Sequence, residues 1–173
     1  MSLNVLISKI NQIVNSRELL DAVGELIIEI IYNRVKSGKG VSDDTVPDPA
    51  PIGLAKLSRS YVEYRRKVRL GEFGSPAKSN LTLTGQMLNN LVYKVLQNRI
   101  LVDIANTKRT PPITSTTGKK RKKKRSSNLP TNKDVAEFVR ENGRPFLALT
   151  PGEQRIVSQF VDEFIEKKLR SLR

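Results

Sequence analysis

The chain contains no histidine, cysteine or tryptophan among its 173 residues. Without histidine and cysteine, the Ser-His-Asp and Cys-His systems have no base or thiol, and zinc, iron and copper sites lose their commonest ligands. Disulfides and thiol redox chemistry are excluded as well, so the sequence does not indicate whether the protein works in an oxidising or a reducing compartment. These absences predict a protein that is not an enzyme and that holds no metal and no cofactor.

Long apolar runs are also missing. No stretch approaches the roughly 18 uninterrupted apolar residues of a membrane span. The first residues, MSLNVLISKI, lack the basic segment and the long apolar segment of a secretory signal. We therefore expect a chain that is not secreted by a standard signal and has no membrane partner.

Three short motifs resemble reactive or ligand-binding sites but lack the required context. Residues 75–78, Ser-Pro-Ala-Lys, match S-x-x-K, yet they fall in a Gly- and Pro-containing loop and the companion motifs are absent. Residues 118–120, Gly-Lys-Lys, lack the first glycine and the Ser/Thr of a phosphate-binding loop. Asp43, Asp44 and Asp48 lack the alternating spacing of a calcium loop, which favours a solvated acidic loop.

The composition predicts one folded domain. The chain is 38% hydrophobic and 28% charged, which is polar for a globular protein but too rich in Leu, Ile and Val for a disordered one. A chain of this length buries about 70% of its unfolded surface on folding. We expect residues 1–173 to form a single domain with exposed polar segments.

Helical periodicity accounts for most of the predicted elements. Apolar residues recur at spacings of three and four over residues 16–37, with Ser16 as the N-cap and Gly38 at the C-terminal end. Residues 150–153, Thr-Pro-Gly-Glu, combine a capping box with proline at the first helical position. Further helices are expected over residues 3–13, from a Ser60–Glu63 capping box to about residue 70, from Thr84 to about residue 91, and over residues 131–142.

Two neighbouring segments predict a β-hairpin. Residues 91–97 and 100–105 are apolar and β-branched and alternate in polarity, with Asn98 and Arg99 between them. Residues 38–53, 71–80 and 106–130 are expected to be loops. The predicted fold class is α+β, with a small antiparallel sheet packed by long amphipathic helices and a long flexible basic loop. Its expected core anchors are Phe146, Phe160 and Phe164.

Positive charge is in large excess. The chain has 31 Lys and Arg against 17 Asp and Glu, a net charge of +14. Half of this excess lies in seven consecutive residues of the loop over residues 106–130: Lys119, Lys120, Arg121, Lys122, Lys123, Lys124 and Arg125. Because like charges repel and cannot be packed in a core, we expect this run to lie outside the core. We call residues 106–130 the basic arm.

The basic arm has two interpretations. Seven adjacent cations can contact the phosphates of a nucleic acid or an acidic protein surface without reading sequence. No aromatic residue lies between Asn106 and Pro130, so stacking on bases is not expected to contribute. The other interpretation is a merely solvated loop.

Three segments follow one another in the order and rough spacing of a known family. The first runs from Ile31-Tyr-Asn-Arg34 through the Pro-rich loop to Leu57-Ser-Arg-Ser-Tyr61 and Tyr64-Arg-Arg-Lys67. The second is LTLTGQM over residues 81–87, similar to L-x-x-T-G-x-[ML]. The third is GRPFLALTPGE over residues 143–153, similar to R-P-F-L-G-L-[ST]. Together they resemble the bacteriophage virion-morphogenesis and tail-completion (Mu G-like) family.

The residues of these motifs suit structural roles. Thr84 can cap a helix, Gly85 permits a close backbone approach, and Met87 packs inward. Arg144 and Pro145 set an extended entry into the last helix, and Phe146 anchors it in the core. Ala148 stands where the family commonly has glycine, and the basic arm is longer than expected of the family.

The resemblance implies a structural virion protein of a tailed bacteriophage. Such proteins act as neck or tail-terminator proteins at the head-tail junction and are present in the host cytoplasm during assembly. The implied assembly is a homo-oligomeric ring, a hexamer, whose partners are the neighbouring connector, neck and tail proteins and the genomic DNA in the channel. The alternative is a sequence-independent nucleic-acid-binding protein that uses residues 119–125.

Overall fold

Helices and two small sheets make up the part of the chain that the computed structural model describes, residues 3–43, 50–67, 81, 85–97, 99–109 and 129–171. The elements are α1 Leu3–Val14, α2 Arg17–Lys36, β1 Lys39–Gly40, β2 Ile52–Gly53, α3 Arg59–Lys67, a 3-10 helix η1 Leu88–Asn90, β3 Leu91–Leu96, β4 Arg99–Ile104, α4 Asn132–Glu141 and α5 Pro151–Ser171. Each sheet has two antiparallel strands. The predicted α+β class is confirmed.

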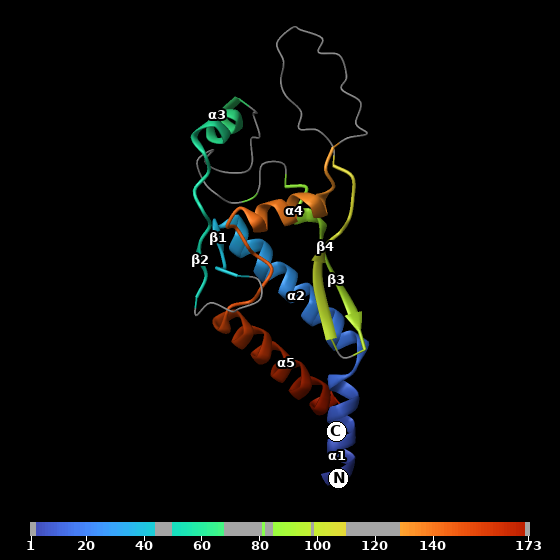
Figure 1. Cartoon of the computed structure of the whole chain (residues 1–173). Helices are drawn as coiled ribbons and strands as arrows, with labels where there is room; N and C mark the ends of the chain where they lie inside the picture. Colours follow the sequence, from blue (N-terminus) through green and yellow to red (C-terminus); the bar gives the residue numbers. More distant parts are fainter. Residues whose placement is uncertain are drawn as a thin grey trace.

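Helix α2 runs through the middle of the molecule (Figure 1). It begins as predicted, because the Ser16 hydroxyl accepts a hydrogen bond from the Leu19 backbone N–H at 3.3 Å. It ends at Lys36 with Ser37 as the C-cap, and Gly38 follows with φ +88°, a left-handed conformation that glycine adopts without a Cβ clash. The apolar residues that recur at helical spacing include its most buried ones: Leu19, Val23, Ile31 and Val35.

Strands β3 and β4 form the predicted hairpin. Leu91 lies opposite Ile104, and Leu96 lies opposite Arg99. Residues 97 and 98 therefore separate the strands, so the turn falls one residue earlier than predicted. Gln97 has φ +53°, the left-handed conformation that two-residue hairpin turns use to match the twist of their strands.

The hairpin packs against α2 at a glycine. A Cβ built on Gly24 would lie 2.4 Å from Cδ2 of the Tyr93 ring. Only a residue without a side chain allows this ring to approach the helix so closely. Figure 1 shows both strands beside α2.

Residues 38–53, predicted to be a loop throughout, contribute a second small sheet. In it Lys39 pairs with Gly53, and Gly40 pairs with Ile52. The prediction was wrong at these positions because strand pairing uses backbone N–H and C=O groups. The residues that pair here are not prolines and keep both groups, although the segment as a whole is rich in Gly and Pro. Gly40 also permits a close contact, since a Cβ there would lie 2.5 Å from the Pro145 carbonyl oxygen.

The hydrophobic core joins distant parts of the sequence. Its most enclosed aromatic residue is Phe146, which is 1% exposed, as predicted for a core anchor. The buried cluster comprises Ile31, Val35, Leu54, Met87, Leu88, Leu91, Ile104, Ala136 and Phe146. Helix α2, the hairpin, α4 and the segment before α5 thus share one core.

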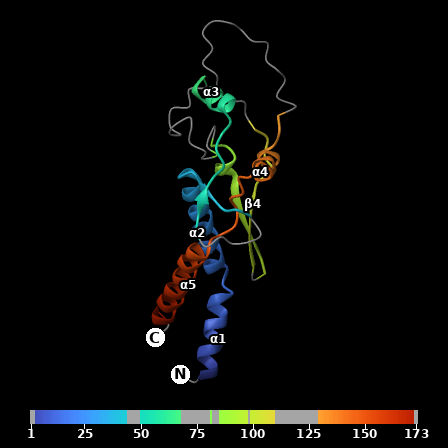
Figure 2. The same cartoon turned by 60° about the vertical axis from the view of Figure 1, so that its left-hand side comes forward.

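Helix α5 lies alongside α2 in the opposite direction (Figures 1 and 2). Arg34 near the end of α2 pairs with Glu153 at the start of α5, and Lys168 pairs with Glu18 at 2.7 Å. The prediction that Phe160 and Phe164 are core anchors was wrong, because both are only half-buried. Helix α5 contacts mainly α2 and α1, so no second layer covers the rest of its apolar face within the described residues.

Helix α1 projects from the body at the end where both chain termini lie (Figures 1 and 2). The helix predicted over residues 3–13 is confirmed. Several of its apolar side chains are exposed to solvent, with exposed fractions of 46% for Val5, 36% for Leu6, 48% for Ile7 and 39% for Val14. An apolar helix with so little cover is unusual for an isolated domain.

Helices α3 and α4 lie at the opposite end (Figure 1). Helix α4 begins where predicted, with Thr131 as its N-cap: Thr131 Oγ1 accepts from the Asp134 N–H at 3.2 Å, and Asp134 Oδ2 accepts from the Thr131 N–H at 2.7 Å. Helix α3 begins before its predicted capping box, because Ser58 and not Ser60 accepts a hydrogen bond from the Tyr61 N–H at 3.3 Å. The predicted extension to residue 70 lies outside the described residues.

Candidate functional site

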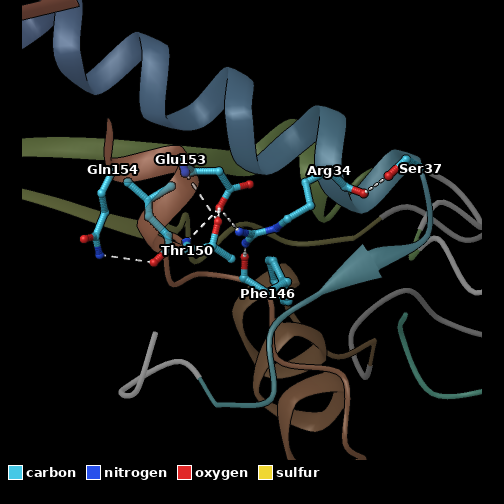
Figure 3. Close-up of polar contacts among 7 residues, drawn as sticks. Arg34, Ser37, Phe146, Thr150, Glu153 and Gln154 are labelled. Carbon is cyan, nitrogen blue, oxygen red and sulfur yellow. Dashed lines mark hydrogen bonds and ion pairs between the residues drawn. The ribbon is translucent and has the colours of Figure 1, made fainter. Parts of the chain in front are cut away.

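Arg34 of α2 and Glu153 of α5 form a buried ion pair (Figure 3). The Arg34 Nη1 donates to Glu153 Oε2 at 2.5 Å, and its Nη2 donates to the carbonyl oxygen of Phe146. The two side chains are only 3% and 11% exposed. Each charge therefore depends on the other, because an unpaired charge at this depth is strongly disfavoured.

The same Glu153 carboxylate takes part in the N-terminal capping of α5. Glu153 Oε2 accepts from the Thr150 backbone N–H at 2.8 Å and from the Thr150 hydroxyl at 3.0 Å. In return, Thr150 Oγ1 accepts from the Glu153 N–H at 3.4 Å. This is the capping box predicted from residues 150–153, and it also anchors α5 to α2.

Arg144 ties the segment before α5 to the segment after β2. Its Nε donates to the Ala55 carbonyl at 3.0 Å, and its Nη2 donates to the Lys56 carbonyl at 2.9 Å. The carbonyl of Pro145 accepts from the Val41 N–H at 3.2 Å. The two Arg144 contacts span 89 and 88 residues, and the Pro145 contact joins equally distant segments, so Arg144 and Pro145 serve the architecture.

Gly85 and Met87 lie at the entry to the 3-10 helix. Gly85 is buried with φ +67°, and its carbonyl accepts from the Asn89 N–H at 2.9 Å. Met87 is 4% exposed and belongs to the core. Thr84, the predicted cap, lies outside the described residues.

A groove of about 580 Å³ opens between α3 and α4. Apolar side chains form much of its wall, and Phe138 of α4 is 63% exposed at it. We call it the α3–α4 groove, and its lining residues are Leu57, Ser58, Tyr61, Arg65, Leu81, Met87, Arg109, Val135, Phe138, Val139, Asn142 and Arg144.

Three arginines give the α3–α4 groove its electrostatic character. Burial raises the pKa of the Tyr61 hydroxyl, while the positive charges of Arg65, Arg109 and Arg144 act against this rise. Burial also lowers the pKa of Arg65, which is 8% exposed, because it disfavours the charged guanidinium. Among the described lining residues there is no Asp or Glu. The groove can therefore accept an anionic group beside an apolar one.

No pattern in the sequence pointed to the α3–α4 groove. A basic amphipathic helix was predicted around Tyr61 and Arg65, which stand four residues apart on one face. Arg109 and Phe138 come from distant segments, and nothing in their local pattern links them to that helix. Only the fold brings these side chains to one hollow.

Several sequence hypotheses fall on residues outside the described part of the chain. These include the seven cations of residues 119–125 and the S-x-x-K match of residues 75–78. Within the described residues, no group of three or more acidic side chains is placed to hold a metal ion. No described helix is long and apolar enough to cross a membrane.

Comparison with known proteins found no matching family model, no similar curated protein and no similar solved structure. The resemblance to the Mu G-like family therefore stays a prediction from three segments of the sequence.

Proposed function

We propose that the chain is a structural virion protein of a tailed bacteriophage. In this role it is a neck or tail-completion protein that forms a homo-oligomeric ring, a hexamer, at the head-tail junction beside connector and tail proteins. It has no enzymatic activity and needs no cofactor. The proposal starts from the three segments that resemble the Mu G-like family.

The observation that carries the proposal is the place of those segments in the fold. Arg34 belongs to the first segment, and it contacts Phe146 and Glu153 of the third. Met87 of the second segment packs in the same core as Phe146. The described residues of these three segments thus connect different elements of the fold. This structural role is expected of a protein that acts as a building block of an assembly.

Exposed apolar surface adds support for an oligomer. The projecting α1 and the half-covered face of α5 leave large apolar side chains in solvent, including Ile7 at 48% and Ile156 at 50% exposure. Large apolar side chains that are exposed together on one face are typical of protein-protein contacts. A ring requires two different faces per copy, since its interfaces are heterologous.

Negative-stain imaging and light scattering of the purified full chain test the proposal. The expected result is rings with an open channel and a mass of six copies at micromolar concentration. A monomer at all concentrations contradicts the proposal. A labelling assay with a serine-directed acylating probe checks the non-enzymatic assignment, and covalent modification of Ser75 overturns it.

A second candidate function, sequence-independent nucleic-acid binding, is favoured by the charge distribution. Residues 38–150 hold 22 Lys and Arg against 9 Asp and Glu, so this segment carries +13 of the net +14. Seven of these positive charges are consecutive, at residues 119–125, and such a run can release counterions from a phosphate backbone. Duplex DNA shifted by a monomeric chain supports this candidate over the ring.

A further inference from the structure

We propose that the α3–α4 groove binds an acidic peptide segment that carries a large apolar side chain and is supplied by a partner protein. The inference rests on the residues of the groove and does not depend on the proposed function.

The apolar wall of the groove defines the first half of the ligand. Leu57, Leu81, Val135 and Val139 line the hollow together with the buried Met87. A volume of about 580 Å³ lies within the range of sites that enclose a small ligand or a few side chains. A leucine or phenylalanine side chain of a partner would replace water against this wall.

The exposure of Phe138 indicates where a bound segment would contact the α3–α4 groove. Phe138 is 63% exposed, more than any other large hydrophobic residue in the described part of the chain. Aromatic side chains at the edge of an apolar hollow are typical anchors of protein-protein interfaces. A bound segment would cover Phe138 and the hollow beside it together.

The arginines define the second half of the ligand. Arg65, Arg109 and Arg144 all line this one groove, so their positive charges lie in the same region. Arg65 is 8% exposed, and burial disfavours its charge. A carboxylate of the partner that enters the groove would lie close to these three positive charges, and their attraction would favour its binding. Charge complementarity therefore selects an acidic segment.

The same residues favour a peptide over a nucleic acid. A single strand binds an open basic channel and stacks its bases on free aromatic faces. Here aliphatic side chains make up much of the wall, and the Tyr61 ring already stacks on Tyr64 with centroids 6.2 Å apart. A compact apolar side chain with neighbouring carboxylates fits this lining better than a phosphodiester.

Fluorescence anisotropy with defined probes tests the inference on the full chain. The probe is a labelled Glu-Glu-Leu-Phe-Glu-Glu peptide at about 150 mM salt, where distant surface charges are largely screened. The first control peptide has Ala-Ala in place of Leu-Phe. The second control is an oligothymidylate of similar charge.

Two matched pairs of variants separate the groove from the general positive charge. Phe138→Ala is paired with Leu101→Ala, since Leu101 is also exposed, at 51%, but lies on β4. Arg109→Gln is paired with Arg140→Gln, since Arg140 is exposed on α4 and does not line the groove. Thermal melts establish that each variant is folded before binding is compared.

We expect the Leu-Phe peptide to bind the wild-type chain. Its affinity should fall by about tenfold in Phe138→Ala and in Arg109→Gln, and by less than about twofold in the control variants Leu101→Ala and Arg140→Gln. The Ala-Ala peptide is expected to bind at least about tenfold more weakly to the wild-type chain.

Four results overturn the inference. Equal binding of both peptides would mean that the net charge alone attracts them. Tighter binding of the oligothymidylate, lost in the same two variants, would mean that the groove is a nucleic-acid site. Displacement of the peptide by self-association of the chain would mean that a second copy fills the groove. Rings that form without peptide binding would refute this inference and leave the proposed function standing.

Discussion

The Glu153 carboxylate is shared between Arg34 of α2 and the N-cap residue Thr150, so one side chain serves both a tertiary contact and a helix start. Arg34 in turn also contacts the Phe146 carbonyl. Buried polar groups joined in this way are costly to remove singly, because each loss leaves another group unpaired.

Arg34→Leu is expected to lower the free energy of unfolding by about 3 to 5 kcal/mol, because it leaves Glu153 without its buried counter-charge. Urea denaturation measures the change. The control is Arg17→Leu: Arg17 pairs with Asp21 at 2.8 Å but its side chain is 69% exposed, so a loss below about 1 kcal/mol is expected. Equal losses in the two variants would contradict a special role for the buried pair.

Asp134 provides a prediction about pH. Hydrogen bonds from the Thr131 backbone and side chain hold its pKa below the ordinary value of 3.8. A carboxyl group whose pKa is lower in the folded state stabilises the protein at pH values above its unfolded-state pKa. This stabilisation is lost as the pH falls through the folded-state pKa. Asp134→Asn should therefore lower Tm at pH 7, and the difference from wild type should narrow at pH values well below 3.8. Glu137→Gln on the same helix controls for the lost charge.

At the scale of elements, the contact between α2 and the hairpin depends on Gly24. Gly24→Ala places a Cβ 2.4 Å from the Tyr93 ring and is expected to cost about 1 to 3 kcal/mol in a denaturant melt. Gly152→Ala is the control, because nothing lies within 4 Å of a Cβ there. It should leave stability unchanged or raise it by up to about 1 kcal/mol. A harmless Gly24→Ala would mean that the hairpin does not pack on α2 in this way.

The phenylalanines around α5 separate a core contact from a surface one. Phe146→Ala should cost about 3 to 5 kcal/mol, since Phe146 is 1% exposed and its removal leaves a cavity. Phe160→Ala should cost only about 1 to 2 kcal/mol in the isolated chain, because its site is open to solvent and collapses easily. Denaturant melts of both variants at low protein concentration measure this. A loss for Phe160 as large as that for Phe146 would mean that a layer covers α5.

At the scale of the whole molecule, charge is segregated along the chain. Residues 1–37 and 151–173, which contain α1, α2 and α5, hold 9 Lys and Arg against 8 Asp and Glu. The remaining segment carries nearly all of the net charge, half of it in residues 119–125. An acidic protein surface or DNA would therefore meet the middle segment and not the terminal helices.

Deletion of residues 119–125 tests the basic arm directly. Full neutralisation of seven phosphates predicts a slope near −6 for log affinity against log salt on duplex DNA with the intact chain, and the deletion should abolish most of it. Folding should survive, because the deletion spares every described helix and strand. An unchanged slope would move the contact to α3 and the residues after it, with Arg65, Arg66, Lys67 and Arg69 as candidates. Absence of DNA binding by the intact chain at about 20 mM salt would favour an acidic protein partner.

Local signals in the sequence were sufficient for much of the fold. The caps at Ser16, Thr131 and Thr150, the period of α2 and the alternation of the hairpin strands are all properties of residues a few positions apart, and the structure contains each of them. The capping motif of α3 was assigned to the wrong serine, because Ser58 and Ser60 present the same hydroxyl and only the chain's path decides between them.

By itself, the sequence determined the fold class, the main helices, the hairpin and the excess of positive charge, because each depends on composition or on short-range periodicity. Tertiary structure alone decided that Arg34 pairs with Glu153, that β1 pairs with β2, that Phe160 stays half-exposed, and that Arg65, Arg109 and Arg144 meet near Tyr61. These outcomes join residues far apart in the chain, and a local pattern carries no information about which distant segments will be brought together. An amphipathic face likewise predicts that a helix will pack, but how much of that face is covered depends on how many layers the rest of the chain supplies.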